Sequence, residues 1–161
     1  MALGKLNAFL FYYEKALRAG KVGIPAGVFS ETSLPQNVES FHNQFVSKLL
    51  LTQALSATVS FFNGEGATAD FPSNGFSLNS YLDALNTEKN GSDLSTLINN
   101  QFQVAFSKIE LLDDNFIEQI TNDNTKMLEA YDELQRNVIL MKVDMLQALS
   151  IDVNYVDADG D

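Results

Sequence analysis

One pair of side chains in this sequence has the spacing of a metal-binding motif. Glu39 and His42 form Glu-x-x-His, which places a carboxylate and an imidazole on one face of a helix. Di-iron carboxylate bundles use two such motifs. The chain has one histidine, so it cannot form a di-iron site by itself, and a mononuclear site at Glu39 and His42 would need further donors. The favoured interpretation is a surface histidine beside the apolar stripe of Phe41 and Phe45.

Three aspartates near the end of the sequence have the spacing of calcium ligands. Asp157, Asp159 and Asp161 recur at every second position, as do the first oxygen ligands of an EF-hand loop. That loop has Gly at its sixth position and Glu at its twelfth, whereas Gly160 is fourth here. A calcium site would need oxygens from elsewhere, so the sequence favours a solvated acidic tail held by Tyr155. Thermal unfolding with and without calcium distinguishes the two interpretations.

A glycine-rich apolar stretch, residues 18–30, could form a binding site or an interface. Its glycines permit positive φ or close backbone approach, and its apolar residues predict a loop packed onto the protein. Its two cations could contact a carboxylate partner or an anionic ligand, or could close the first helix. The candidate ligand or interface residues are Arg18, Lys21, Gly23, Pro25 and Gly27.

The sequence contains no recognisable catalytic set. It has no cysteine, which excludes disulfides, thiolate metal ligands and a thiol nucleophile. It also lacks G-x-S-x-G, H-E-x-x-H and phosphate-binding glycine motifs. We therefore expect the chain by itself to have no proteolytic activity.

Length and composition predict one globular domain over residues 1–161. The chain is 45% hydrophobic and contains twelve Phe, which favours a real core. Ten Lys and Arg against 21 Asp and Glu give a net charge of −11, which repels nucleic acid and anionic lipid surfaces. No uninterrupted apolar run approaches the roughly 20 residues of a bilayer span, and no signal peptide pattern is present. We expect neither nucleic-acid binding nor direct membrane insertion.

Apolar residues recur at helical spacing along most of the chain. The first stripe, Leu3 to Leu17, is expected to end at Gly20, and Ser77 and Ser92 are expected helix N-caps. Residues 151–155 alternate apolar and polar side chains, which predicts an extended segment. The sequence therefore predicts an all-α, up-and-down four-helix bundle with short inserted helices and an extended C-terminal tail. Inward-facing apolar stripes mark the predicted helices at residues 3–17, 38–62, 81–85, 94–112, 116–120 and 128–149. Start signals for the second lie at residues 34–37, and the third is expected to stop near Asn90-Gly91.

Several segments together resemble the C-terminal half of imelysin-like proteins, particularly those of Bacteroidetes-type bacteria. The most specific are Gly-Ile-Pro-Ala-Gly-Val-Phe at 23–29 and the Asp-Gly-Asp ending at 159–161. The resemblance extends over nearly the whole chain. Its other segments are Val-Glu-Ser-Phe at 38–41, Phe-Phe-Asn-Gly at 61–64, Tyr-Leu-Asp-Ala-Leu at 81–85 and Lys-Val-Asp-Met at 142–145.

The resemblance implies a cell-envelope protein built from two helical bundles. Such proteins lie in the periplasm or at the cell surface, often as outer membrane lipoproteins, are associated with iron or haem uptake, and have a peptidase label inherited from the founding member. The signature Gly-x-His-x-x-Glu belongs to the N-terminal half and does not occur in this sequence. Because Glu39 and His42 have the reverse order, the resemblance assigns no catalytic or metal residue here.

Two functions follow as hypotheses. In the first, the chain is a non-catalytic binding or scaffolding module, either one half of a two-bundle protein or a single-bundle relative. Its partner would be the N-terminal imelysin half or another envelope protein. In the second, the chain is part of a metal-dependent peptidase whose Gly-x-His-x-x-Glu site lies in an N-terminal half. The reading frame upstream of Met1 distinguishes the two hypotheses.

Overall fold

The computed structural model of the protein describes residues 3–66 and 76–152. Helices account for most of these residues, and one two-stranded hairpin accompanies them. In chain order the elements are α1 (Leu3–Phe11), η1 (Tyr12–Gly23), α2 (Ile24–Ala26), η2 (Pro35–Asn37), η3 (Gln44–Val46), α3 (Ser47–Asn63), α4 (Leu78–Ala84), β1 (Glu88–Lys89), β2 (Ser92–Asp93), α5 (Leu94–Glu110), α6 (Phe116–Asp123), α7 (Thr125–Ile139), η4 (Leu140–Met145) and α8 (Leu146–Ala148).

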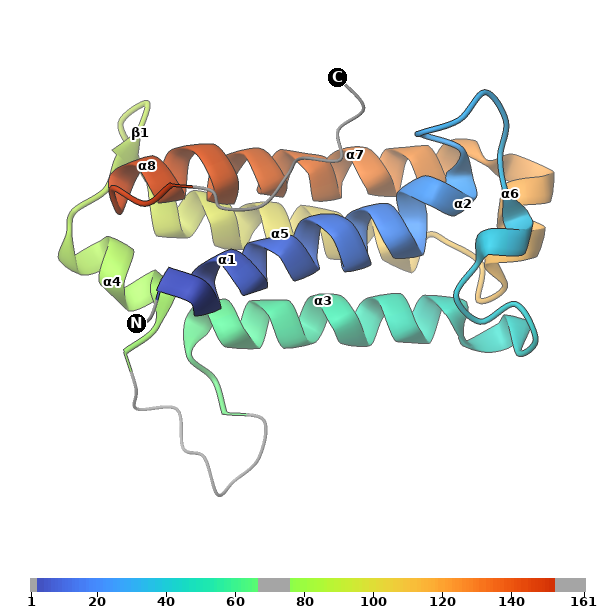
Figure 1. Ribbon diagram of the computed structural model, residues 1–161, viewed down its shortest axis with the longest axis horizontal. Coiled ribbons are helices and arrows are strands. Elements are labelled where there is room, and N and C mark those ends of the chain that lie inside the picture. The colour runs from blue at the N-terminus through green and yellow to red at the C-terminus, as the bar shows by residue number, and fades with distance from the viewer. Residues whose placement is uncertain (1–2, 67–75, 153–161) are drawn as a thin grey trace.

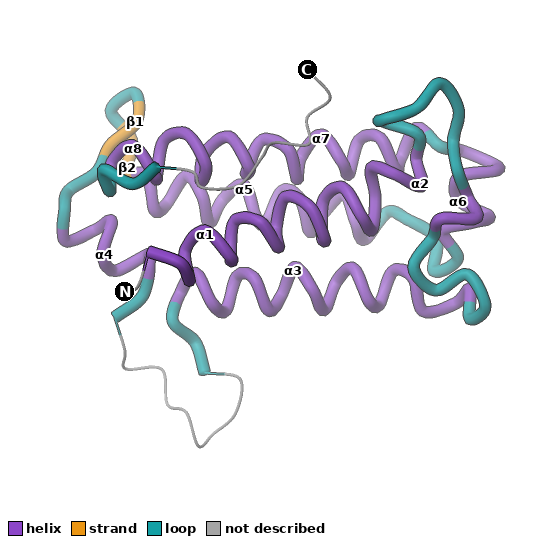
Figure 2. The backbone as a smooth tube through the Cα atoms, viewed as in Figure 1, coloured by secondary structure: helices purple, strands orange, loops and turns teal. Residues whose placement is uncertain are grey.

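The long helices lie side by side along the long axis of the molecule (Figure 1). α1, α3, α5 and α7 form the body, with α4, the hairpin and α8 at one end and α2 and α6 at the other. The connecting loops gather at these two ends (Figure 2). The prediction of an all-α helical bundle is confirmed.

The core lies between the long helices. The apolar stripe predicted over 94–112 is buried from Leu94 to Leu112, which confirms that helix. Phe102 is central: its ring centroid lies 5.9 Å from those of both Tyr13 and Phe62. Other large buried side chains are Leu6, Leu10, Leu17, Leu51, Leu55, Ile98, Ile109, Leu134, Val138 and Met141.

The first helix is longer than the sequence predicted. It runs from α1 through the π-helical η1 to Ala26, so residues 18–26 are helix and not loop, and Gly20 lies inside the helix. The Ile24 N–H donates to the Ala19 carbonyl, five residues back, which is the π-helical pattern. Pro25 lies near the end of this continuous helix, where its missing N–H removes one backbone donor. The helix ends at Gly27, which has φ +83°.

The second long helix begins later than predicted. Residues 38–46 form turns that cross the end of the bundle, and Val38 is buried there. Phe41 and Phe45, predicted as part of a core stripe, are 42% and 72% exposed. The ammonium of Lys48 donates to carbonyls at the end of α5, which ties the first turn of α3 to that helix. This attachment is long-range, and local periodicity does not show it.

Other local signals gave mixed results. Ser77 caps α4 as predicted, but Asp93, not Ser92, caps α5 by accepting from the Thr96 N–H. Asn90-Gly91, predicted as a helix stop, forms the two-residue turn between β1 and β2, with φ of +55° and +78°. Asn-Gly is a preferred sequence for such a hairpin turn. Leu128, predicted to point inward, is 39% exposed.

One segment of the described chain, Gln44–Asn63, is long and apolar enough to cross a membrane by length and composition alone, with a mean hydropathy of 1.4. Its inner side chains, including Leu51, Leu55 and Phe62, are fully buried in the bundle. Its outer side is exposed, so that 33% of its most apolar stretch is buried.

Candidate functional site

The five predicted interface residues lie at one end of the bundle, but they do not form one exposed surface. Arg18, Gly23 and Pro25 are buried inside the helix end. Lys21 and Gly27 are partly exposed beside them. We call this helix end, with Phe29 and Tyr131 packed against it, the Arg18 joint.

Arg18 is the largest fully buried side chain of the described residues, at 1% exposure. Its Nη1 donates to the Tyr131 hydroxyl at 2.8 Å and to the Gln135 side-chain carbonyl. Its Nη2 lies 3.7 Å from Glu14 Oε1, one helical turn earlier. A guanidinium buried in this way is satisfied by protein groups, so it holds α7 against η1.

Two aromatic rings cover the Arg18 guanidinium. Its carbon lies 5.2 Å from the centroid of the Tyr131 ring and 5.9 Å from that of Phe29. The two rings meet edge to face with centroids 5.9 Å apart. Cation–π contacts strengthen when they are desolvated. Phe29, two residues after Gly27, is thereby held against the Arg18 guanidinium and the Tyr131 ring.

Further charged groups converge on Glu14, which is 1% exposed. Lys142 Nζ, from η4, lies 3.2 Å from Glu14 Oε2, and Lys15 Nζ lies 3.4 Å from Oε1. Both π-helical stretches therefore contribute to one ionic cluster. The sequence reasoning missed Glu14, Lys142, Tyr131 and Gln135. One local signal was available, because Glu14 precedes Arg18 by four residues beside the buried stripe.

Tyr13 lies next to this cluster and is fully buried. Burial raises its pKa, and the hydrogen bond with Asn137 and the charge of Arg18 oppose that shift only in part. The phenol therefore stays protonated and donates to the Leu134 carbonyl at 3.2 Å.

Gly23 and Gly27 of the joint occupy positions where a residue with a Cβ would clash with its neighbours. A Cβ on Gly23 would lie 2.7 Å from the Tyr131 ring and 2.8 Å from the Phe29 ring. A Cβ on Gly27 would lie 2.6 Å from the Thr32 carbonyl oxygen, at a positive φ. Beyond the turn, the Pro25 carbonyl accepts from the Leu34 N–H at 2.8 Å. Each contact fixes the path of the chain after the helix.

Glu39 and His42, which the sequence offered as a pair of metal ligands, make contacts with different residues in the structure. Glu39 forms an ion pair with Lys21 of the joint, and His42 is exposed with its ring perpendicular to that of Phe41. Residues 3–66 and 76–152 contain no group of three or more His, Cys, Asp or Glu that could hold a metal ion. The predicted calcium ligands Asp157, Asp159 and Asp161 lie outside the described residues.

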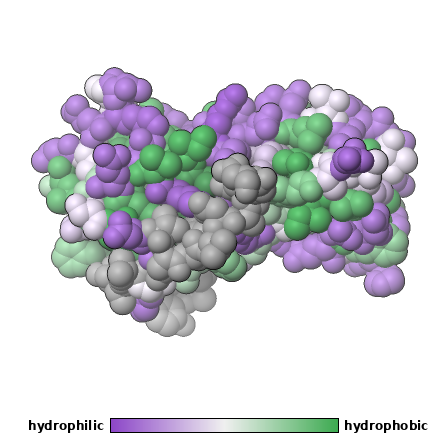
Figure 3. Space-filling model, turned by 45° about the horizontal axis from the view of Figure 1, so that its top comes forward, coloured by the Kyte–Doolittle hydropathy of each residue, from purple (hydrophilic) through white to green (hydrophobic). Residues whose placement is uncertain are grey.

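Apolar side chains are exposed on α2 and on the loop that follows it. Ile24, Val28 and Phe29 are 37–38% exposed, and Phe41, farther along the chain, is 42% exposed. We call these four residues the joint platform. Figure 3 shows apolar surface in the right half of the molecule, the half that contains this end of the bundle.

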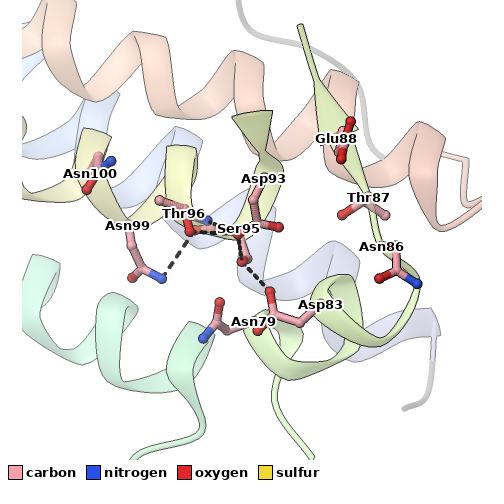
Figure 4. Close-up of a pocket in the computed structure, with 10 residues that line it drawn as sticks. All are labelled: Asn79, Asp83, Asn86, Thr87, Glu88, Asp93, Ser95, Thr96, Asn99 and Asn100. Atoms are coloured by element: carbon pink, nitrogen blue, oxygen red, sulfur yellow. Dashed lines mark hydrogen bonds between the residues drawn. The ribbon is translucent and has the colours of Figure 1, made fainter. Parts of the chain in front are cut away.

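A polar cleft of about 490 Å³ lies at the opposite end, between α4, the hairpin and α5. Figure 4 shows Asn79, Asp83 and Asn99 pointing into the space between α4 and α5. Ser95 donates to Asp83, and its Oγ also lies 2.9 Å from an Asp93 carboxylate oxygen. Carboxylates, amides and hydroxyls line this cleft, and none of the described residues that line it is cationic. It can accept hydrogen bonds and repels anions.

Comparison with known proteins identifies no relative: no protein-family model matches the chain, and no curated protein or solved structure is detectably similar. The resemblance to imelysin-like proteins therefore stays a prediction from the sequence segments.

Proposed function

We propose that the chain is a non-catalytic binding module: the C-terminal half of an imelysin-like cell-envelope protein that docks a second helical bundle through the joint platform. The periplasmic or cell-surface location and the association with iron or haem uptake belong to this proposal and rest on the sequence resemblance alone.

The observation that carries the proposal is an exposed apolar loop on a rigid, buried base. Ile24 and Val28 lie on either side of the Gly27 turn, whose backbone is fixed by contact with Thr32. Phe29 is held by the Arg18 guanidinium and the Tyr131 ring. A surface loop that is already ordered loses little conformational entropy when a partner covers it. Such a loop is suited to docking.

The burial of Arg18 favours a positioning role for that cation over contact with a ligand. An anion-binding arginine must reach the ligand, whereas Arg18 is 1% exposed and donates to Tyr131 and Gln135. Arg18 therefore positions the platform and does not contact the partner. Lys21 is paired with Glu39 at the edge of the same end, where a partner's polar rim would lie.

The test is binding to the half that carries Gly-x-His-x-x-Glu, expressed from the reading frame that contains this chain. Calorimetry should give a dissociation constant that rises at least about tenfold in Ile24→Asp and in Val28→Asp, since each places a charge in an apolar contact. Val104→Asp is the matched control, because Val104 is 41% exposed on α5 and is not part of the joint platform.

Equal affinity of the platform variants and the control would refute the docking role. A reading frame without a second helical half would remove the proposed partner.

A further inference from the structure

A surplus of positive charge lies where the two π-helical stretches meet. Among the described residues, three cations surround the carboxylate of Glu14: Lys15, Arg18 and Lys142. We call these four residues the Glu14 cluster. The Lys15 and Lys142 side chains are 14% and 12% exposed. A buried charge is costly unless an opposite charge compensates it, so a cluster of three cations and one carboxylate is suited to a further anion.

The ammonium of Lys15 shows this surplus most directly. Its Nζ is buried and makes no hydrogen bond to any residue that the structure describes. It lies 3.4 Å from Glu14 Oε1, and that oxygen is shared with Lys142 Nζ at 3.3 Å and with Arg18 Nη2 at 3.7 Å. An ammonium has three N–H donors and needs acceptors when it is buried. A second carboxylate beside Lys15 would supply them.

The described end of the chain turns back toward this cluster. Ser150, with φ +54°, follows α8, and the Ile151 N–H donates to the Leu146 carbonyl at 2.9 Å, so the chain reverses along the bundle (Figure 1). The Asn7 side chain then donates to the Asp152 carbonyl at 3.5 Å, which fixes the chain on α1. The chain therefore reaches Asp152 on the same continuous helix that carries most of the Glu14 cluster.

One face of that helix leads from the exit point to the cluster. Asn7, Phe11, Glu14 and Arg18 follow at intervals of four, three and four, which keeps them on one side of a helix. Phe11 is 48% exposed. At about 1.5 Å per residue, Phe11 lies about 6 Å and Glu14 about 10 Å beyond Asn7. The face thus presents an aromatic ring first and cations after it.

The acidic segment, residues 153–161, lies outside the described residues and has matching side chains in the same order. Alternate residues of an extended chain face one side, so Tyr155, Asp157 and Asp159 share a face in that conformation. An extended chain advances about 3.3 Å per residue, which gives a reach from Asp152 of about 10 Å at Tyr155 and about 16 Å at Asp157. The segment is long enough to place its aromatic ring on Phe11 and its carboxylates on the cluster.

We propose that residues 153–161 bind back along this face as an internal acidic ligand, with the Tyr155 ring on Phe11 and the carboxylates of Asp157 and Asp159 on the lysines of the Glu14 cluster. Hydrogen bonds between ammonium and carboxylate groups are among the stronger ones in proteins. The loop to be closed is short because the chain is already fixed at Asp152. The bound segment ties η1 to η4. This inference rests on different contacts from the proposed function and does not depend on it.

Chymotrypsin cleavage after Tyr155 tests the proposal in the full chain. When a segment opens and recloses faster than the protease cuts, the cleavage rate follows the open fraction. Mass spectrometry measures the loss of residues 156–161. Lys15→Met/Lys142→Met should raise the rate at least about tenfold, because hydrogen bonds to charged groups are lost. The matched control, Lys108→Met/Lys126→Met, removes the same charge elsewhere and should leave the rate unchanged.

Substitutions in the segment and at Phe11 test the other side of the contact. Asp157→Asn/Asp159→Asn should raise the rate as much as the lysine pair, after division by the rate for a free peptide of the same sequence. Combining the two pairs should add no further increase, because both remove the same contacts. Phe11→Ala should raise the rate roughly threefold or more, whereas Phe45→Ala, at a ring that is 72% exposed, should not. Circular dichroism checks that each variant is folded.

A parent chain cleaved as fast as the free peptide would overturn the proposal. Equal rates for the two lysine pairs, or additive effects of the lysine and aspartate pairs, would do the same. Cleavage that is accelerated by a calcium chelator and unaffected by Lys15→Met/Lys142→Met would show that calcium holds the segment instead. If a lysine variant does not fold, the aspartate pair and Phe11→Ala decide the question.

Discussion

The two ends of the bundle use polar side chains in opposite ways. At the Arg18 joint, Arg18 and Glu14 are each 1% exposed and satisfied by protein groups. At the polar cleft, Asp83 and Asp93 are exposed, and they accept hydrogen bonds from Ser95 and Thr96. A buried charge must be paired because it cannot be hydrated, whereas an exposed charge keeps its water. The joint is therefore a rigid base and the cleft an open surface.

The largest expected effect comes from removing the buried cation. Arg18→Met removes the buried donor to Tyr131 and Gln135 and one of the cations beside Glu14, which keeps Lys142 and Lys15, so unfolding in urea should show a loss of about 3 kcal/mol. Lys108→Met is the matched control: Lys108 pairs with Glu129 on the surface at 2.9 Å and should cost at most about 1 kcal/mol. An equal loss of unfolding free energy in the two variants would show that the Arg18 joint stabilises the fold no more than a surface ion pair does.

Alanine substitution of one glycine at each end of the bundle compares how tightly the two ends are packed. Gly27 and Gly91 both have positive φ, of +83° and +78°, so alanine at either should cost roughly 1–2 kcal/mol from backbone strain. At Gly27 the new Cβ also meets the Thr32 carbonyl at 2.6 Å, whereas at Gly91 it meets nothing within 4 Å. Gly27→Ala should therefore lower the urea midpoint more than Gly91→Ala. The reverse order would contradict the packed turn described here.

The smallest expected effect is a pH dependence at the exposed end. Hydrogen bonds from the Thr96 and Ser95 side chains lower the pKa of Asp93 below its ordinary value. A carboxylate with a lowered folded-state pKa stabilises the fold above the unfolded value of about 3.9, and that contribution is lost as pH falls through the folded value. The stability difference between the parent chain and Asp93→Asn should stay constant from neutral pH down to about 5 and shrink below about 4. A difference that persists unchanged at pH 3 would exclude this carboxylate as its source.

Local sequence determined the helices and part of the joint. The apolar spacing from Leu94 to Leu112 predicts a helix whose stripe is buried, because a helix repeats every 3.6 residues whatever it packs on. The glycines and proline of residues 23–27 drew attention to this segment, and the first helix ends within it, at Gly27. The use of Gly27 as a helix end follows from its lack of a Cβ, a property of one residue.

The tertiary structure decided what the charged residues do. Arg18 is buried because Tyr131 and Gln135, 113 and 117 residues away, supply acceptors, and no local pattern encodes that pairing. The same holds for Lys142 on Glu14 and for the exposure of Phe45, which depends on where the chain crosses the end of the bundle. A charge or an aromatic ring can be stable in water or in a core, and only the long-range partners that surround it select one of the two.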